Sequence, residues 1–318
     1  MKALGLACAL LLAAAADSLG AAPRHDPAIA TLQARDAQLF AMGWRLARAN
    51  APFCAGAAPA LGLGILDAGG FGDPAAVRRQ LGLSGDLAVG VVAPASPAES
   101  SGLRANDTLI TIGDSVLANV YPPDKPSWRR LIAVTAALDG AAARGPVAIT
   151  IARAGEEPRT VLLTPVAACP SRFEVLDSGG KAMAEGTRVI FGRSFPGFEY
   201  PEAEFAAAVA HEFAHNLLGH RALLDAKGRS LGNVRLTERE ADRLMPWLLA
   251  NAGFEPVAAL RFMQRWGPRH DGGLFRNRNH EGWDERADAI AAEIAVVDAA
   301  MAREGRADWR HFRRETLD

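Results

Sequence analysis

The chain has 318 residues, of which 49% are hydrophobic, and its formal net charge is -1 at pH 7. This composition excludes a mainly disordered chain, and the length is sufficient for about two domains. The near-neutral charge excludes the basic surface with which proteins bind nucleic acid or anionic lipid, so we expect neither partner.

Residues 1–22 have the layout of a secretory signal peptide: a lysine, an apolar run to about Ala16, and then small residues. We expect cleavage near Ala16 or Ala22 and a periplasmic or secreted protein. A lipoprotein anchor at Cys8 is the competing interpretation, which Gly5 and the very short charged leader disfavour. No later stretch has the ~20 apolar residues that a membrane span requires, so we expect no transmembrane segment in the mature chain.

Residues 27–50 are predicted to form an amphipathic helix, because apolar side chains recur there with the spacing of one helix face. These side chains are Ile29, Leu32, Leu39, Met42 and Leu46.

From residue 76 to residue 166 the sequence predicts a small, mostly β module. Short runs rich in β-branched residues alternate there with Gly, Pro, Asn and Asp, which is typical of strands joined by turns. The runs are LAVGVV, DTLITIG, PVAITIARAG and RTVLLTPV. After residue 170, KAMAEGTRVIFGRSF predicts a strand pair, and helical patterns dominate from there to residue 304.

Two cysteines remain if Cys8 leaves with the signal peptide, and an exported protein meets oxidising conditions. We therefore predict a disulfide between Cys54 and Cys169; the alternative is two buried free thiols. The two residues flank the β module, so a disulfide would hold together both ends of an insertion.

Within the module, GVVAPASPAESSGLRANDTLITIGD resembles a PDZ domain of the bacterial protease type. The resemblance implies that the extended C-terminus of a ligand adds as a strand beside residues 87–92, with its carboxylate held by the loop at residues 81–86. The implied peptide-binding residues are Leu81, Gly82, Leu83, Leu87 and Val89. Asp86 is an acid beside this supposed anion site, and a PDZ-shaped spacer or lid is the alternative.

The stretch AHEFAHNLLGH, residues 210–220, concentrates candidate metal ligands. A helix is predicted because the run AEFAAAVAHEFAHNLL contains no helix breaker. His211 and His215 would then leave the same face and can converge on one zinc ion. Glu212 could take a proton from the attacking water and deliver it to the leaving amine. The alternative is a helix with satisfied surface histidines.

A catalytic zinc site normally has three protein ligands, so a third must come from elsewhere. The stretch TEREADRL offers Glu238. Thr237 and Glu240 match a capping box, which predicts that a second helix begins there, with Glu238 in its first turn. Asp242 lies four residues later on the same face. It is placed to accept the second ring N–H of either metal-binding histidine and to fix that ring's orientation.

HEFAH followed by EREAD resembles the M48 family of zinc metallopeptidases. AMAEGTRVIFGRSF is similar to the strands before the motif in that family, ANAGFEPVAALRFMQRW to its following helix pair, and NHEGWDER to its His-x(5)-Arg element. The resemblance implies one Zn²⁺ per chain. It implies the ligands His211, His215 and Glu238, the general base Glu212, and catalytic roles for His280 and Arg286.

His280 is interpreted as the donor that stabilises the tetrahedral oxyanion. Glu281 stands where the family often has Pro, and a plain loop histidine is the alternative. For Arg286 the alternative is a cap or an ion pair of the last helix. His220 lies five residues after His215, which does not fit the longer three-histidine pattern, so we interpret it as structural.

We therefore predict an α+β fold, in which a mainly helical zincin-type metallopeptidase domain is interrupted by a small, mostly β PDZ domain. The predicted divisions are a signal peptide (1–22), the peptidase domain (23–75 and 167–304), the PDZ domain (76–166) and a solvated, locally basic tail (305–318).

The expected function is that of an exported zinc endopeptidase whose PDZ domain presents or screens protein or peptide substrates, C-termini among them. One alternative is a periplasmic PDZ scaffold or chaperone-like factor with a latent peptidase domain, and another is a zinc hydrolase of non-peptide substrates. The presence of Glu212 favours the peptidase, because a scaffold does not need it.

Overall fold

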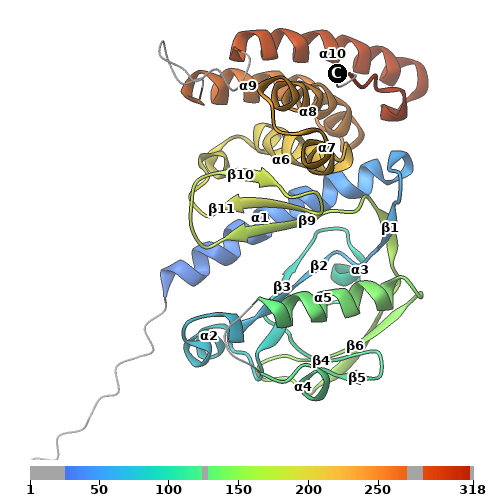
Figure 1. Cartoon of the computed structure of the whole chain (residues 1–318). Coiled ribbons are helices and arrows are strands. Elements are labelled where there is room, and N and C mark those ends of the chain that lie inside the picture. Colours follow the sequence, from blue (N-terminus) through green and yellow to red (C-terminus); the bar gives the residue numbers. More distant parts are fainter. Residues whose placement is uncertain (1–25, 124–127, 271–281, 316–318) are drawn as a thin grey trace, which may run out of the picture.

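The computed structural model describes residues 26–123, 128–270 and 282–315. These residues form a mixed α+β structure, which confirms the predicted fold class at that level (Figure 1). The predicted signal peptide with Cys8, and the predicted oxyanion donor His280, lie outside the described residues.

One half of the molecule consists of helices packed on a three-stranded sheet (Figure 1). Its strands are β9 (Arg172–Leu176), β10 (Ala182–Ala184) and β11 (Arg188–Gly192). The central strand β11 is antiparallel to β10 and parallel to β9, so the strand pair predicted over residues 181–195 is confirmed.

The helices of this half include α1, which confirms the helix predicted over residues 27–50. It begins where the Asp26 carboxylate accepts the N–H of Ala28 at 2.8 Å and Pro27 occupies the first turn. The six helices are α1 (Pro27–Asn50), α6 (Glu202–Leu217), α7 (His220–Lys227), α8 (Leu231–Asn251), α9 (Val257–His270) and α10 (Trp283–Glu304).

The core of this half lies between α6, α8 and the three-stranded sheet. Phe191, Phe205, Phe213 and Leu244 are fully buried there. Burial of each such side chain stabilises the fold by about 1.5–3 kcal/mol. The core therefore holds α6 and α8 in fixed positions against each other.

Helix α8 begins upstream of its predicted start. Its N-cap is Ser230, whose hydroxyl accepts the N–H of Asn233 at 3.2 Å. Thr237 lies inside the helix and donates its hydroxyl to the carbonyl of Val234 at 2.8 Å. The capping box predicted from Thr237 and Glu240 is therefore wrong: the spacing is present, but the helix has already begun.

The other half is a six-stranded antiparallel sheet with its own core (Figure 1). The strand order is β2-β3-β4-β6-β7, and β5 pairs with β4. The strands are β2 (Leu63–Asp67), β3 (Leu87–Val92), β4 (Thr108–Ile112), β5 (Ser115–Val116), β6 (Val147–Ala152) and β7 (Arg159–Leu163). The helices are α2 (Pro74–Leu81), α3 (Pro97–Ser100), α4 (Leu117–Val120) and α5 (Arg129–Ala142).

This sheet starts before residue 76, where the sequence predicted the module to begin. Its first strand, β2, pairs along its whole length with β3. The run LGILD is short and contains a glycine, so it gives a weak strand signal. Helix α5 also lies within the segment that was predicted to be mostly β.

A narrow junction joins the two halves. Strands β1 (Ala58–Ala60) and β8 (Val166–Ala168) form an antiparallel ribbon, and next to it Cys54 and Cys169 form a disulfide with a Cα–Cα distance of 5.6 Å. The predicted disulfide is confirmed. Helix α1 contacts β9 of one half and β3 of the other, which adds a second connection.

The C-terminal segment, residues 305–315, packs against the helical half, so the prediction of a solvated tail is wrong for these residues. Ala307 and Phe312 are buried, and the side chain of Asn251 accepts the N–H of Ala307 at 3.0 Å and donates to its carbonyl at 2.8 Å. The local excess of arginine hid these anchors in the sequence. Within the described parts of the chain, no helix combines the length and the apolar character that a membrane crossing needs.

Candidate metal centre

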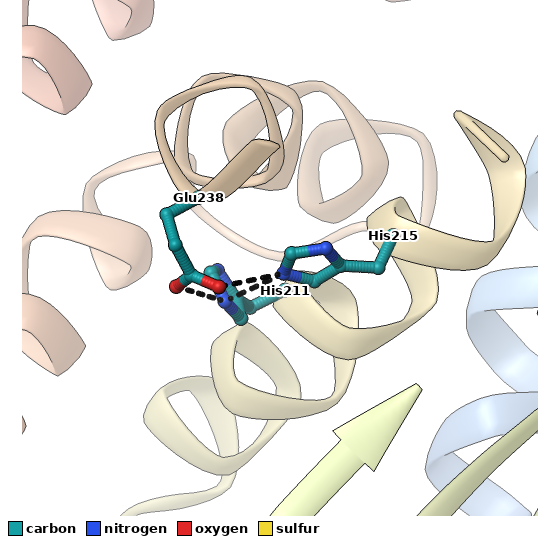
Figure 2. Close-up of side chains that lie close together, drawn as sticks. All are labelled: His211, His215 and Glu238. Atoms are coloured by element: carbon teal, nitrogen blue, oxygen red, sulfur yellow. Dashed lines mark hydrogen bonds and ion pairs between the residues drawn. The ribbon is translucent and has the colours of Figure 1, made fainter. Parts of the chain in front are cut away.

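The three residues predicted as metal ligands converge on one point. Helix α6 carries His211 and His215 one turn apart, and α8 brings Glu238 opposite them. The two Nε2 atoms lie 3.2 Å apart, and each lies 3.5 Å from a carboxylate oxygen of Glu238. Figure 2 shows the three side chains pointing toward one another from the two helices.

This donor set suits a zinc ion. One ligand atom from each residue lies within 4.8 Å of the other two. Two imidazole nitrogens and one carboxylate oxygen form the ligand set of a large class of catalytic zinc sites, in which a fourth position remains for water or substrate. The side chain of His211 is 11% exposed and that of Glu238 is 22% exposed, so the cluster is sheltered but reachable.

Asp242, which was predicted to orient one of the two histidines, faces His211. Its Oδ1 atom lies 3.1 Å from His211 Nδ1. Arg286, on α10, donates to the same carboxylate at 2.5 Å and 2.9 Å, and its Nη2 lies 3.4 Å from Glu238. Arg286 is therefore buried against the two acids that face His211, which matches the ion-pair alternative for this residue.

His220, interpreted as structural from the sequence, contacts His215, the second histidine of the cluster. Its Nδ1 lies 2.8 Å from the Nδ1 of His215, and its Nε2 lies 3.0 Å from Glu240. The sequence spacing hid this contact, because Gly219, with φ at 68°, ends α6 and redirects the chain into α7. A glycine between two histidines, which can adopt a left-handed conformation, is the feature of the sequence that could have predicted the contact between His215 and His220.

Glu212, the predicted general base, lies on α6 directly after His211. Burial raises the pKa of its carboxyl group to about 7, and the Glu238 carboxylate adds to the increase, while His211 and Arg286 oppose it. A group with a pKa near 7 can both accept and release a proton at neutral pH, as acid–base catalysis requires.

The pKa values of the remaining groups of the cluster are shifted in different directions. Burial would lower the pKa of His211, but Asp242 and Glu238 together raise it to about 10. Burial lowers the pKa of His215 to about 3. Burial opposes ionisation of Glu238, yet the neighbouring His211, His215 and Arg286 hold its pKa well below the usual range. A metal ion would therefore compete with a proton on His211, because ligands must be deprotonated to bind.

Comparison with known proteins gives no further assignment: no family model and no curated protein matches this chain. The functional assignment therefore rests on the geometry of the site and on the residue types in it.

The residues predicted to bind a peptide in the β module lie in two places. Leu81 ends α2, Gly82 is its left-handed C-cap, and Leu83 is buried behind it. Leu87 and Val89 lie on β3, whose neighbours on its two sides are β2 and β4. A peptide cannot add beside β3, so the prediction of residues 87–92 as the receiving strand does not agree with the structure. The sequence showed the strand but not its neighbours. Among the described strands, the edges of this sheet are β2 and β7.

Asp86 does not face an empty anion site. Its carboxylate pairs with Arg78 and with Arg130, the latter at 3.0 Å. Burial alone would raise the pKa of this carboxyl group, but the two arginines together lower it. The positive groups beside the loop, Arg78 of α2 and Arg130 of α5, are thus already matched by acids of the module itself.

Proposed function

We propose that this protein is a zinc-dependent endopeptidase of the type that its motifs resemble, with a PDZ-like module inserted in a zincin-like domain and an exported location. The observation that carries the proposal is the convergence of His211, His215 and Glu238 beside the half-buried Glu212. Burying several charged groups costs free energy even when they are paired, so a scaffold protein would gain little stability from this arrangement.

A zinc ion held by His211, His215 and Glu238 would supply a Lewis acid that lowers the pKa of a water molecule and polarises a peptide carbonyl. Glu212 accepts the proton of the attacking water on its carboxylate and then delivers it to the leaving amine nitrogen. Asp242, whose Oδ1 lies 3.1 Å from Nδ1 of His211, would favour the tautomer with its proton on Nδ1, which leaves Nε2 as the ligand atom. Arg286 holds Asp242 and Glu238 in their ionised forms.

A peptide is the favoured substrate because an edge strand lies beside the metal centre. Among the described strands, β10 pairs only with β11, and it contacts α6. The turn after β10 is fixed to α6 at the residue next to His215, since the N–H of Gly186 donates to the side chain of Asn216 at 2.7 Å. An extended peptide can add to such an edge through backbone hydrogen bonds.

The β module would present or screen substrates, as the PDZ resemblance implies. The edge strand β2 is the place where a peptide could add, in contrast to the interior strand β3. Its selectivity would then concern extended segments or C-termini of protein substrates.

The test is hydrolysis of casein and of labelled peptides by the purified protein, the Glu212→Gln variant and a chelated sample, with zinc content measured in each. Glu202→Gln is the matched control, because Glu202 lies on the same helix at the exposed end, where its contact is with Arg45.

We expect chelator-sensitive cleavage by the unaltered protein and by Glu202→Gln. Glu212→Gln should retain zinc and lose at least about 10²- to 10⁴-fold in rate, which is the usual contribution of a general acid–base group. Zinc binding without cleavage by the unaltered protein would favour a latent or scaffolding protein, and retained turnover in Glu212→Gln would remove this residue from its role.

A further inference from the structure

A chain of buried side chains leads away from the metal centre to the C-terminal segment. It starts at the Nδ1 atom of His215, which lies 2.8 Å from Nδ1 of His220. His220 Nε2 lies 3.0 Å from the carboxylate of Glu240. Glu240 in turn accepts the backbone N–H of Glu315 at 2.7 Å and the Arg314 guanidinium at 3.0 Å. His220 and Glu240 are almost completely buried.

The hydrogen-bond directions along this chain follow from the role of His215. If its Nε2 binds a metal ion, the ring proton must be on Nδ1, so Nδ1–H donates to His220. His220 can accept at Nδ1 only if its own proton is on Nε2, and that N–H then donates to the carboxylate of Glu240. A carboxylate can only accept, so it fixes the tautomers of both rings.

The two metal-binding histidines are thus held by two parallel arrangements. His211 faces the carboxylate of Asp242, which Arg286 holds. His215 reaches a carboxylate through one additional imidazole, and Arg314 and the backbone of Glu315 hold that carboxylate. Both arrangements end in a buried acid paired with an arginine, but the second depends on a segment far away in the sequence.

We propose that His220 and Glu240 are positioning residues that orient His215 for metal binding, and that the C-terminal segment, residues 305–315, keeps them in place. This inference rests on the proposed metal site. The segment is suited to the task because Ala307, Asp308 and Phe312 are buried and anchor it to the helical half. Loss of the segment would release Glu240, and through His220 the ring of His215.

A purely structural role for His220 is the competing explanation, and two substitutions separate the roles. His220→Leu retains much of the volume but removes the acceptor for His215. His220→Asn retains an amide oxygen near the position of Nδ1, so it can restore that acceptor while losing the contact with Glu240.

The measurements are zinc affinity by competition with a chromophoric chelator, the absorption spectrum of the cobalt-substituted protein, and the unfolding midpoint of the metal-free protein. We expect His220→Leu to lose about 10- to 100-fold in zinc affinity, as is typical when the partner of a metal ligand is removed. Its cobalt spectrum should change as well. His220→Asn should recover most of the affinity.

The C-terminal part of the inference is tested with Arg314→Leu, compared with Arg313→Leu, which alters the exposed neighbouring arginine. Arg314→Leu should weaken zinc binding less than His220→Leu, because the N–H of Glu315 still holds Glu240. Arg313→Leu should leave zinc affinity unchanged. Equal zinc affinities for the two arginine variants would contradict a role for Arg314.

If folded His220→Leu binds zinc with unaltered affinity and cobalt with an unaltered spectrum, the positioning role is wrong, even if the protein is less stable. If the unaltered protein binds neither zinc nor cobalt, the proposed function itself fails and this inference fails with it. The two failures are therefore distinguishable.

Discussion

Both halves of the molecule bury acids that pair at both oxygens with one arginine, Asp242 with Arg286 among them, but Glu238 of the helical half is neutralised differently. In the β module, Asp107 is almost fully buried and accepts two hydrogen bonds from Arg153, at 2.7 Å and 2.8 Å. Asp67 is paired in the same two-point manner with Arg130. In the helical half, Glu238 lies against two imidazoles whose Nε2 atoms converge with its oxygens.

This contrast shows which buried charges indicate a site. An acid paired at both oxygens with one arginine has little capacity left for a ligand. Three side chains whose ligand atoms converge from two helices create a place for a cation, which has to displace the proton of His211. Buried acids and shifted pKa values occur in both halves. The candidate metal site differs from the ion pairs of the β module because its imidazole nitrogens and carboxylate oxygens converge on one point.

The largest effect on the free energy of unfolding is expected for Arg286→Met. Arg153→Met in the β module is its matched comparison. Each substitution leaves a buried aspartate without its arginine, which should lower the free energy of unfolding by about 3–5 kcal/mol. The two variants should differ in zinc binding, since only Arg286 contacts the acids of the metal centre. Chemical denaturation and chelator competition measure the two quantities. Equal zinc affinities would show that the ion pair of Arg286 serves stability alone.

Removal of the disulfide tests the junction between the halves. Replacement of both Cys54 and Cys169 by serine should lower the free energy of unfolding by about 2–4 kcal/mol, because the unfolded chain loses a constraint. Zinc affinity should be unchanged, since the site lies on α6 and α8, away from the junction ribbon. A fall in zinc affinity in the folded double variant would mean that the junction also shapes the metal centre.

Asp242→Asn tests the metal centre itself with little change in side-chain shape. We expect zinc affinity to fall by about 10- to 100-fold, because the ring of His211 loses a charged acceptor. Asp225→Asn, at an exposed position on α7 outside the centre, is the matched control. Unchanged zinc affinity in Asp242→Asn, measured by chelator competition, would count against its assignment.

The smallest expected effect is a change in the pH dependence of stability. It concerns Asp36 on α1, the helix that contacts both halves. Burial raises the pKa of its carboxyl group to about 7, and Glu174 contributes in the same direction, although the N–H of Val175 donates to it. The folded protein therefore binds this proton more tightly than the unfolded chain, so stability should decrease as the pH rises from about 4 to about 7.

Asp36→Asn should remove that decrease, so its free energy of unfolding should increase relative to that of the unaltered protein between pH 4 and pH 8. The amide oxygen can still accept the N–H of Val175. Unfolding midpoints at the two pH values measure it. Identical pH profiles for both proteins would exclude a contribution of Asp36.

Local patterns in the sequence were sufficient for much of this fold. Helical spacing identified α1, the breaker-free run identified α6, and the positions of Cys54 and Cys169 identified the disulfide. For the two helices, the pattern and its cause lie in the same short segment. For the disulfide, each cysteine has only one possible partner once the signal peptide is removed.

The features that the sequence did not reveal depend on contacts between distant segments. The capping-box spacing of Thr237 and Glu240 occurs inside α8, because the carboxylate of Glu240 binds His220 and the returning C-terminal segment instead. The interior position of β3 follows from the pairing of β2, a strand whose glycine weakens its strand signal. Helix periodicity was sufficient to predict that His211 and His215 share one face of α6, whereas the neighbouring groups that contact them could not all be predicted.

X-ray absorption at the zinc edge of the purified protein would identify the metal ligands themselves. We predict two imidazole nitrogens at about 2.0–2.1 Å and oxygen ligands at about 2.0–2.2 Å, with no sulfur at about 2.3 Å. A variant that combines His211→Ala with His215→Ala should then retain no zinc. Zinc bound without imidazole, or bound equally by that double variant, would contradict the assignment of the metal centre.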